Sequence, residues 1–312
     1  MTAHSNKSIP DASQEPTHAG ANRTPYSEGF AKRMAKMAAK PMIDIQVCDH
    51  CNLRCAGCLH FAPLAEPRFL DLDKYEKDLE RLASIEGIDG YFDTVVLMGG
   101  EPLLHPRIAD VIRLTRRFLP TQNVGLCTNG LKLKRMGEDF WSAIVECDVQ
   151  IALSPYPIAM DYAALVELAR KKGARVTFNG DITDTHEGKE VFMRLALDPE
   201  GRCDPTRSFV SCPVGGRTLQ LARGAIWPCQ VAALHGDFAR RFGFDMHSGP
   251  DDALPIASIA AVGDIEAFRR RSHGMCRYCD NDALSVMPWE LSKLAATEWL
   301  SPRALDQGQD TL

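Results

Sequence analysis

Four cysteines lie close together early in the chain. Cys48, Cys51, Cys55 and Cys58 fall within the eleven residues "CDHCNLRCAGC", and the last three have the spacing C-x₃-C-x₂-C. Three thiolates can hold three corners of a [4Fe–4S] cluster and leave the fourth iron open to another ligand. A structural zinc ion would need four ligands in two separated pairs, with Cys48 completing the set. The spacing favours the cluster, and zinc stays as the alternative.

The composition is that of an ordinary globular protein. Of 312 residues, 45% are hydrophobic and 25% are charged, and the net charge is −5. This balance gives no reason to expect a nucleic-acid or membrane partner, and no segment has the roughly 20 apolar residues of a membrane helix. Residues 1–25 lack an apolar h-region, so we expect a disordered tail and not a secretory signal. We therefore expect a cytoplasmic, reducing location and no structural disulfides among the eleven cysteines.

Apolar runs alternate with amphipathic segments from residue 42 to about residue 180. Helices are expected between the apolar runs, where apolar residues recur at helical spacing, and a short basic helix is expected at 26–40. Strands are predicted at 42–47, 93–98, 123–128, 149–154 and 175–179. This alternation predicts parallel βα units, most simply a full or partial barrel.

A glycine-rich turn follows the second predicted strand. Gly99, Gly100, Glu101 and Pro102 lie there, on the barrel edge where the cysteine loop also lies. Glycines at this edge would let a ligand approach the backbone closely. A plain strand–turn–helix junction uses the same residue types, so the turn alone does not decide between the two interpretations.

Together the two motifs resemble those of the radical S-adenosylmethionine (radical SAM) superfamily. The cysteine spacing matches the cluster loop of that family, and "GGEP" matches its motif for the methionine part of SAM. "CTNG", which contains Asn129, resembles the third-strand ending, and Ser154 ends the fourth strand where the family often places a polar SAM contact. The resemblance covers roughly residues 42–180.

This resemblance implies a set of site residues and a chemistry. Cys51, Cys55 and Cys58 would hold a [4Fe–4S] cluster whose open iron chelates SAM. One electron, from a donor of the flavodoxin or ferredoxin type, would cleave SAM to methionine and a 5′-deoxyadenosyl radical that abstracts hydrogen from the substrate. The implied SAM contacts are Gly99, Gly100, Glu101, Pro102, Asn129 and Ser154.

The chain departs from the family pattern just before the last cysteine. The family usually has an aromatic residue there, in contact with the adenine, whereas this chain has Gly57. His60 and Phe61 are the nearest residues that could supply that contact. Cys48 lies outside the pattern, and we expect it to be a buried or half-buried free thiol.

A second set of cysteines lies in the last third of the chain. Cys212 and Cys229 are a widely separated pair, and Cys276 and Cys279 form a C-x₂-C. Four thiolates suit a structural zinc ion and a second [4Fe–4S] cluster equally well. Residues 217–230 are expected to form a hairpin, two apolar runs joined at Arg223 and Gly224. Its stretch from Gly224 to Cys229 resembles the twitch domain, the short form of the SPASM auxiliary-cluster domain, which implies one auxiliary cluster.

Other cysteines and histidines have less specific surroundings. Cys203 is kept as a spare thiol for the second set. Cys127 and Cys147 are expected to pack in the core, and His105 and His273 are expected to be structural.

The predicted fold is an α/β partial (β/α)6-type TIM barrel followed by a small α+β auxiliary-cluster domain. The expected segments are a tail (1–25), the barrel (26–200), the twitch-type domain (201–285) and a C-terminal helix and tail (286–312). This layout is similar to that of 2-deoxy-scyllo-inosamine dehydrogenase, which implies oxidation of a carbinol on a small carbohydrate or cyclitol. A peptide-modifying (RiPP) maturase and a sugar epimerase or dehydratase are the enzymatic alternatives, and a non-catalytic zinc-binding regulator is the alternative from another class.

Overall fold

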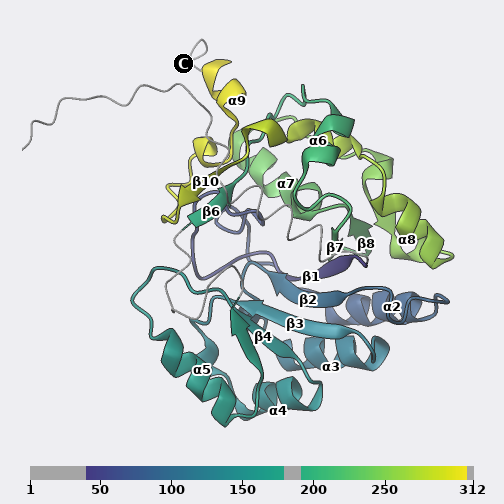
Figure 1. The fold of residues 1–312 in the computed structure, drawn as a ribbon, viewed down its shortest axis with the longest axis vertical. Helices are drawn as coiled ribbons and strands as arrows, with labels where there is room; N and C mark the ends of the chain where they lie inside the picture. The colour runs from purple at the N-terminus through teal and green to yellow at the C-terminus, as the bar shows by residue number, and fades with distance from the viewer. Residues whose placement is uncertain (1–39, 179–190, 308–312) are drawn as a thin grey trace, which may run out of the picture.

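The computed structural model describes residues 40–178 and 191–307 (Figure 1). The tail predicted for 1–25 lies outside the described residues. So do the basic helix predicted at 26–40, apart from Lys40, and the point near residue 181 where the regular alternation was expected to end.

Five parallel strands and four helices form the first part of the described chain, residues 40–178. The strands are β1 (Met42–Cys48), β2 (Thr94–Gly99), β3 (Asn123–Thr128), β4 (Gln150–Leu153) and β5 (Val176–Phe178). The helices between them are α2 (Leu72–Ala83), α3 (Ile108–Phe118), α4 (Glu138–Glu146) and α5 (Tyr162–Lys171). All five predicted strands are confirmed, each within one residue of its predicted ends, and each is parallel to its neighbour.

The sheet continues into the second half of the chain. Strand β7 (Thr218–Ala222) pairs in parallel with β1, and β8 (Ala225–Trp227) and β9 (Leu254–Pro255) follow antiparallel, so the order is β5-β4-β3-β2-β1-β7-β8-β9. Among the described residues the partial barrel therefore has six parallel strands, but the sixth comes from beyond residue 200 and lies beside β1. Within the described residues β5 and β9 are the edges of the sheet, and the barrel does not close.

The hairpin predicted around Arg223 and Gly224 is confirmed. These residues connect β7 to β8 with φ values of 54° and 76°, the left-handed conformation that a two-residue turn of type I′ requires. The remaining regular elements are α6 (Pro205–Ser211), α7 (Gln230–Phe242), α8 (Val262–Arg269), α9 (Pro302–Gln307) and the antiparallel pair β6 (Val191–Arg194) and β10 (Ser285–Pro288).

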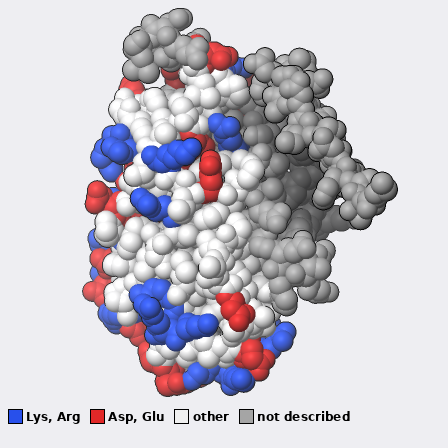
Figure 2. All heavy atoms as spheres, turned by 90° about the vertical axis from the view of Figure 1, so that its left-hand side faces the viewer, with Lys and Arg blue, Asp and Glu red and all other residues white. Residues whose placement is uncertain are grey.

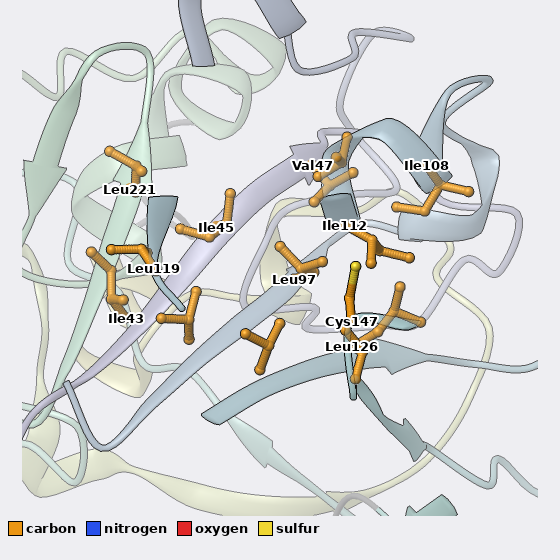
Figure 3. Close-up of a cluster of buried hydrophobic side chains, with 14 of the residues drawn as sticks. Ile43, Ile45, Val47, Leu97, Ile108, Ile112, Leu119, Leu126, Cys147 and Leu221 are labelled. Carbon is orange, nitrogen blue, oxygen red and sulfur yellow. The ribbon is translucent and has the colours of Figure 1, made fainter. Parts of the chain in front are cut away.

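Strand β1 is buried on both faces, which places its end inside the molecule. Ile43, Ile45 and Val47 point into the core between the sheet and the helices, where Figure 3 shows them near Leu97. The alternate residues, among them Asp44, are also buried and face the other side. Burial of apolar residues at every second position holds β1 in register, so the loop that follows it starts from a fixed point.

A second core lies beyond β1. It is built around Phe238 on α7 and the fully buried Trp299, and it includes Phe61 from the loop after β1. In Figure 1 this half of the chain, green to yellow, lies beyond β1 on the side away from α2–α5. The cysteine loop is therefore packed between the two halves.

The surface carries charges of both signs. Figure 2 shows acidic and basic side chains interspersed over the face that it presents. Among the helices of the described residues, none combines the length and apolarity needed to cross a membrane.

Candidate functional site

The three cysteines of the first motif lie in one loop after β1. The Sγ of Cys51 accepts hydrogen bonds from Leu53 N (3.3 Å) and Asn129 Nδ2 (3.6 Å). Burial raises the pKa of the Cys51 thiol, and the nearby Glu101 carboxylate and the other two thiols raise it further. The structure therefore brings Cys51, Cys55 and Cys58 together, but their role as cluster ligands stays a prediction.

The glycine motif lies against the start of this loop. An added Cβ on Gly99 would lie 2.3 Å from the Cys48 carbonyl oxygen, and one on Gly100 would lie 2.0 Å from the His50 carbonyl oxygen. Gly99 also has φ 139°. The two glycines are therefore required because the ends of β1 and β2 touch, a reason that the sequence analysis did not foresee. Their contact with SAM stays a prediction.

Glu101 joins the ends of β2 and β3. Its buried carboxylate accepts hydrogen bonds from Leu103 N (3.0 Å), Thr128 Oγ1 (2.6 Å) and Asn129 N (2.9 Å). Burial raises the pKa of Glu101 to about 7, although these bonds oppose the shift. Pro102, which follows, is buried in the short 3₁₀ turn η1 (Pro102–Leu104). Glu101 thus acts within the structure by fixing the end of β3.

Asn129 connects β3 to the cysteine loop. Its Nδ2 donates to Asn52 Oδ1 (2.8 Å) and to Cys51 Sγ, while its Oδ1 accepts from Leu131 N (2.9 Å). At the end of the next strand, the buried Ser154 donates its N–H to the Thr128 carbonyl (2.9 Å). The residues predicted to contact SAM therefore lie along one edge of the sheet, beside the cysteine loop.

Two residues at this edge differ from their expected roles. Cys127 is half-buried and its Sγ lies 3.7 Å from Ser154 Oγ, so the prediction that it packs in the core was wrong. Cys127 lies on the opposite face of β3 from Leu126, and it is Leu126 that packs in the core. Tyr156 was missed: burial raises its pKa well above the ordinary value, and the thiols of the cysteine loop and Cys127 raise it further. Its position three residues after the end of β4 was the available signal.

Neither His60 nor Phe61 can supply the aromatic contact that the family usually has at the position of Gly57. Phe61 is fully buried between Phe238 and Trp299, and His60 is buried with its Nδ1 3.2 Å from Gln46 Oε1. Both side chains are engaged in the interior, so neither supplies the contact for which they were considered.

The second set of cysteines surrounds one small pocket. It is lined by all four of them: Cys212, Cys229, Cys276 and Cys279. Burial is the main cause that raises the pKa of Cys279, and the other three thiols raise it further. Burial likewise raises the pKa of Cys229 to about 12 and that of Cys276 to about 11. Without a positive charge in the pocket, these thiols are therefore neutral.

The backbone around Cys229 would stabilise a thiolate at this pocket. Cys229 is the N-cap of α7, and its Sγ accepts a hydrogen bond from Ala232 N (3.5 Å) at the positive end of the helix dipole. Cys276 and Cys279 lie in and directly after the 3₁₀ turn η5 (Gly274–Tyr278). Four thiols that line one pocket would fit a metal group that carries positive iron, and the assignment of these ligands stays a prediction.

The remaining cysteines and histidines lie outside both sets. Cys203 lines a neighbouring surface cleft with Asp280 and Arg303, not the pocket of the other four thiols. Cys48 is buried with its Sγ 3.1 Å from His50 Nδ1, and Cys147 packs in the core as predicted. His105 and His273 contact backbone carbonyls, those of Leu70 (2.9 Å) and Phe268 (3.0 Å), as expected of structural histidines.

A buried polar network was also missed. Gln46 Oε1 lies 3.2 Å from both His60 Nδ1 and Gln220 Nε2, and Asp44 Oδ2 accepts from Gln230 Nε2 (2.9 Å). Burial raises the pKa of Asp44 to about 7 and lowers that of His60 to about 4. The alternation of apolar and polar residues in "IDIQV" was the signal: the polar face of β1 points toward β7 and α7, which carry Gln220 and Gln230.

Two observations complete the description of the site. Among the residues that the structure describes, no group of three or more Cys, His, Asp or Glu side chains is arranged to bind a single metal ion. A cleft of about 640 Å³ lies at the opposite end of the sheet, lined by residues that include Arg116, Asn123 and Gln150, and it contains none of the predicted site residues.

Comparisons with known proteins identify several relatives. No family model matches the chain. A GTP 3′,8-cyclase 2 of Mycobacterium bovis is 33% identical over 285 residues, 85% of this chain and 77% of that protein. A GTP 3′,8-cyclase of Alkaliphilus metalliredigens is 27% identical over 155 residues, 50% of this chain and 44% of that protein. The chain thus spans less than half the length of the first curated relatives that it matches.

Solved structures are also similar. The crystal structure of BtrN in complex with AdoMet and 2-DOIA matches with a TM-score of 0.49 and 18% identity, over 79% of this chain and 95% of that chain.

Proposed function

Because the chain belongs to the radical SAM superfamily, whose enzymes use a [4Fe–4S] cluster and SAM, we propose that it oxidises a carbinol of a small carbohydrate or cyclitol to a ketone. The barrel would hold the SAM cluster at Cys51, Cys55 and Cys58. The region from about 201 to 285 would hold one auxiliary [4Fe–4S] cluster.

One observation carries this proposal: four thiols, not three, line the auxiliary pocket. Four thiolates would complete the ligation of a cubane cluster and leave no iron open to a substrate. A cluster ligated in this way is suited to electron transfer, and an oxidation needs an electron acceptor. Cys212, Cys229, Cys276 and Cys279 are therefore proposed as its ligands.

The reaction balances as a two-electron oxidation. When bound, the SAM cluster and SAM supply the 5′-deoxyadenosyl radical, at the cost of one electron from a flavodoxin- or ferredoxin-type donor. Transfer of a hydrogen atom from the carbinol carbon gives 5′-deoxyadenosine and leaves an unpaired electron beside oxygen. Loss of that electron to the auxiliary site and of the hydroxyl proton to solvent would give the ketone. The auxiliary site would return the electron to the donor, so that SAM is the net two-electron oxidant. Each turnover uses one SAM and releases one methionine.

The chain's own residues would position the substrate and exclude water. The cysteine loop is packed between the barrel and the second core, with Phe61 buried against Phe238. Asp44 and Gln46 on β1 are buried and hydrogen-bonded to Gln230 and Gln220 of the second half of the chain, which would keep the end of β1 and the loop that follows it in place. Proximity and exclusion of water are the contributions that such a fold makes to radical chemistry.

A second candidate function is cyclisation of GTP. It is favoured by the relative from Mycobacterium bovis, a GTP 3′,8-cyclase 2 of which this chain covers 77% at 33% identity.

The two candidates are separated by counting products anaerobically. Purified holoenzyme is incubated with SAM, a reductant and one of a panel of cyclitols, sugars, GTP and peptides. Carbinol oxidation predicts one ketone for each 5′-deoxyadenosine. A cyclised guanosine triphosphate, a product isomeric with its sugar substrate or a crosslinked peptide would each replace the oxidation proposal with another reaction of the superfamily.

A variant tests the role of the auxiliary site in the same assay. Cys276→Ala should still produce 5′-deoxyadenosine but release little ketone, because the substrate radical is quenched by other routes. Cys203→Ala is the matched control and should keep the one-to-one ratio. Equal ketone yields from Cys276→Ala and the parent enzyme would rule out the auxiliary site as electron acceptor.

A further inference from the structure

A segment near the C-terminus lies alongside the cysteine loop. Ala56 N donates to the Glu290 carbonyl (3.0 Å), Ser292 N donates to the Arg54 carbonyl (2.9 Å), and Cys55 and Leu291 form an antiparallel bridge. Residues 289–292 thus pair with the backbone of the loop that carries the three cysteines.

The pairing brings an indole N–H to one of the sulfurs. Trp289 Nε1 lies 3.3 Å from Cys55 Sγ in hydrogen-bond geometry, although the two residues are 234 positions apart. Trp289 is half-buried, and its ring lies 6.0 Å from that of Tyr156, which itself lies among the thiols. The donor is therefore held by backbone pairing on one side and by an aromatic contact on the other.

The same segment explains the glycine before the last cysteine. Gly57 is buried with φ 63°, and an added Cβ would lie 3.3 Å from the Glu298 carbonyl oxygen and 3.4 Å from Met287 Sδ. A side chain at position 57 would be strained by its backbone and would meet the C-terminal segment. Gly57 therefore allows residues 287–298 to approach the loop closely.

The C-terminal segment is itself firmly attached. Strand β10 pairs with β6, Leu197 N donates to the Trp299 carbonyl (2.8 Å), and Ser301 N donates to the Leu197 carbonyl (2.8 Å). Trp299 is fully buried in the second core and donates its indole N–H to the Cys58 carbonyl oxygen (3.0 Å). Two tryptophans of one segment thus reach the loop, one at a sulfur and one at a backbone oxygen.

From this geometry we infer that Trp289 is a positioning residue that tunes the SAM cluster, by donating a hydrogen bond to the sulfur of its ligand Cys55. The inference rests on the proposed function, in which Cys51, Cys55 and Cys58 ligate that cluster. Reduction adds negative charge to a cluster and its sulfurs, so an N–H donor stabilises the reduced state and raises the reduction potential. The C-terminal segment would therefore make the SAM cluster easier to reduce.

The test is a redox titration of Trp289→Phe, which keeps a ring at this position and removes the donor. The cluster is followed through the electron paramagnetic resonance signal that changes when SAM is added, which separates it from an auxiliary cluster. Iron content should be unchanged, and the midpoint potential should become more negative. A tenfold fall in the reduction equilibrium constant, about 59 mV for a one-electron couple, is the expected order.

Trp299→Phe is the matched control, because it removes an indole donor from the same loop but from a carbonyl oxygen, not from a sulfur. Its potential should stay at that of the parent protein. If Trp289→Phe loses iron, the parent side chain is replaced with an indole isostere that carries sulfur in place of the N–H. The inference would be overturned if Trp289→Phe, or the protein with the isostere at position 289, had its full iron content and the midpoint potential of the parent protein.

A second readout detects the hydrogen bond directly. In the reduced parent protein, the indole proton of Trp289 should be one of several exchangeable protons that couple magnetically to the SAM-responsive cluster, beside those that Leu53 and Asn129 donate to Cys51. Its coupling should disappear in Trp289→Phe and persist in Trp299→Phe, while the couplings at Cys51 remain in both variants. Failure of the proposed function has a different signature: the Cys51→Ala, Cys55→Ala, Cys58→Ala triple variant would keep the SAM-responsive signal. A cluster at these cysteines without an effect of Trp289 would refute only the inference made here.

Discussion

The Nδ2 of Asn129 lies 3.6 Å from the Sγ of Cys51, where the loop after β1 meets the end of β3. The same amide group donates to Asn52 Oδ1, and its backbone N–H is held by the buried carboxylate of Glu101. The cysteine loop and the "GGEP" motif, about 50 residues apart in the chain, are thus joined through Asn129 into one hydrogen-bonded site.

Asn129→Ala should weaken SAM binding to the holoenzyme by about tenfold, or about 1.4 kcal/mol, because the amide hydrogen bonds at the cysteine loop are lost. Binding is measured anaerobically from the change in the cluster spectrum on SAM titration. Asn123→Ala is the control, since Asn123 is an exposed residue at the other end of the same strand. Equal SAM affinities in the two variants would show that Asn129 has no role at the site.

The auxiliary ligand set predicts the behaviour of single cysteine variants. Alanine in place of Cys212, Cys229, Cys276 or Cys279 should lower both the iron content and the stability, because metal binding in a small domain contributes to folding. Iron analysis and thermal unfolding of each variant check this. Cys203→Ala should behave as the parent protein. A larger effect of Cys203→Ala than of Cys212→Ala would mean that Cys203 is the fourth ligand.

Asp44 predicts a pH dependence of stability. Burial raises its pKa from 3.8 to about 7 in the folded protein, so folding favours the neutral acid. The free energy of unfolding should therefore fall as pH rises from about 4 to about 7 and then stay level. Asp44→Asn cannot ionise but can still accept the hydrogen bond from Gln230, so its free energy of unfolding should not show this fall with pH.

Denaturant unfolding of both proteins at several pH values measures the effect. Between pH 5 and pH 8, the free energy of unfolding of Asp44→Asn relative to that of the parent should rise by up to about 3 kcal/mol. This figure follows because each unit of pKa shift corresponds to about 1.4 kcal/mol. Other buried groups, such as Glu101, titrate in both proteins and cancel in the difference. A difference that does not change with pH would contradict a raised pKa for Asp44.

The sequence predicted those features that are encoded locally. Strands were found from apolar runs such as "DTVVLM" around β2, and both cysteine sets were found from their spacing. The pairing of β7 with β1 was not predicted, because β7 lies about 170 positions further along the chain and no local pattern specifies which edge it joins. The approach of Trp289 to Cys55 was missed for the same reason.

Other misses had a visible signal. The polar residues Asp44 and Gln46 alternate with apolar ones in β1, which indicates a strand with one apolar and one polar face, although it was interpreted only as an apolar strand. The same alternation in β3 places Cys127 on the face opposite Leu126. A rule of two-residue periodicity, applied to each strand, would have found both.

The central claim is that Cys51, Cys55 and Cys58 hold the cluster that cleaves SAM. Anaerobically purified parent protein should contain about eight irons per chain, from two cubane clusters, and the variant with all three cysteines changed to Ala should contain about four. The most direct measurement is 5′-deoxyadenosine production from SAM by that variant, with Cys203→Ala as a single-cysteine control. The account predicts that the triple variant makes none while the control retains the activity. Cleavage of SAM by the triple variant would contradict it.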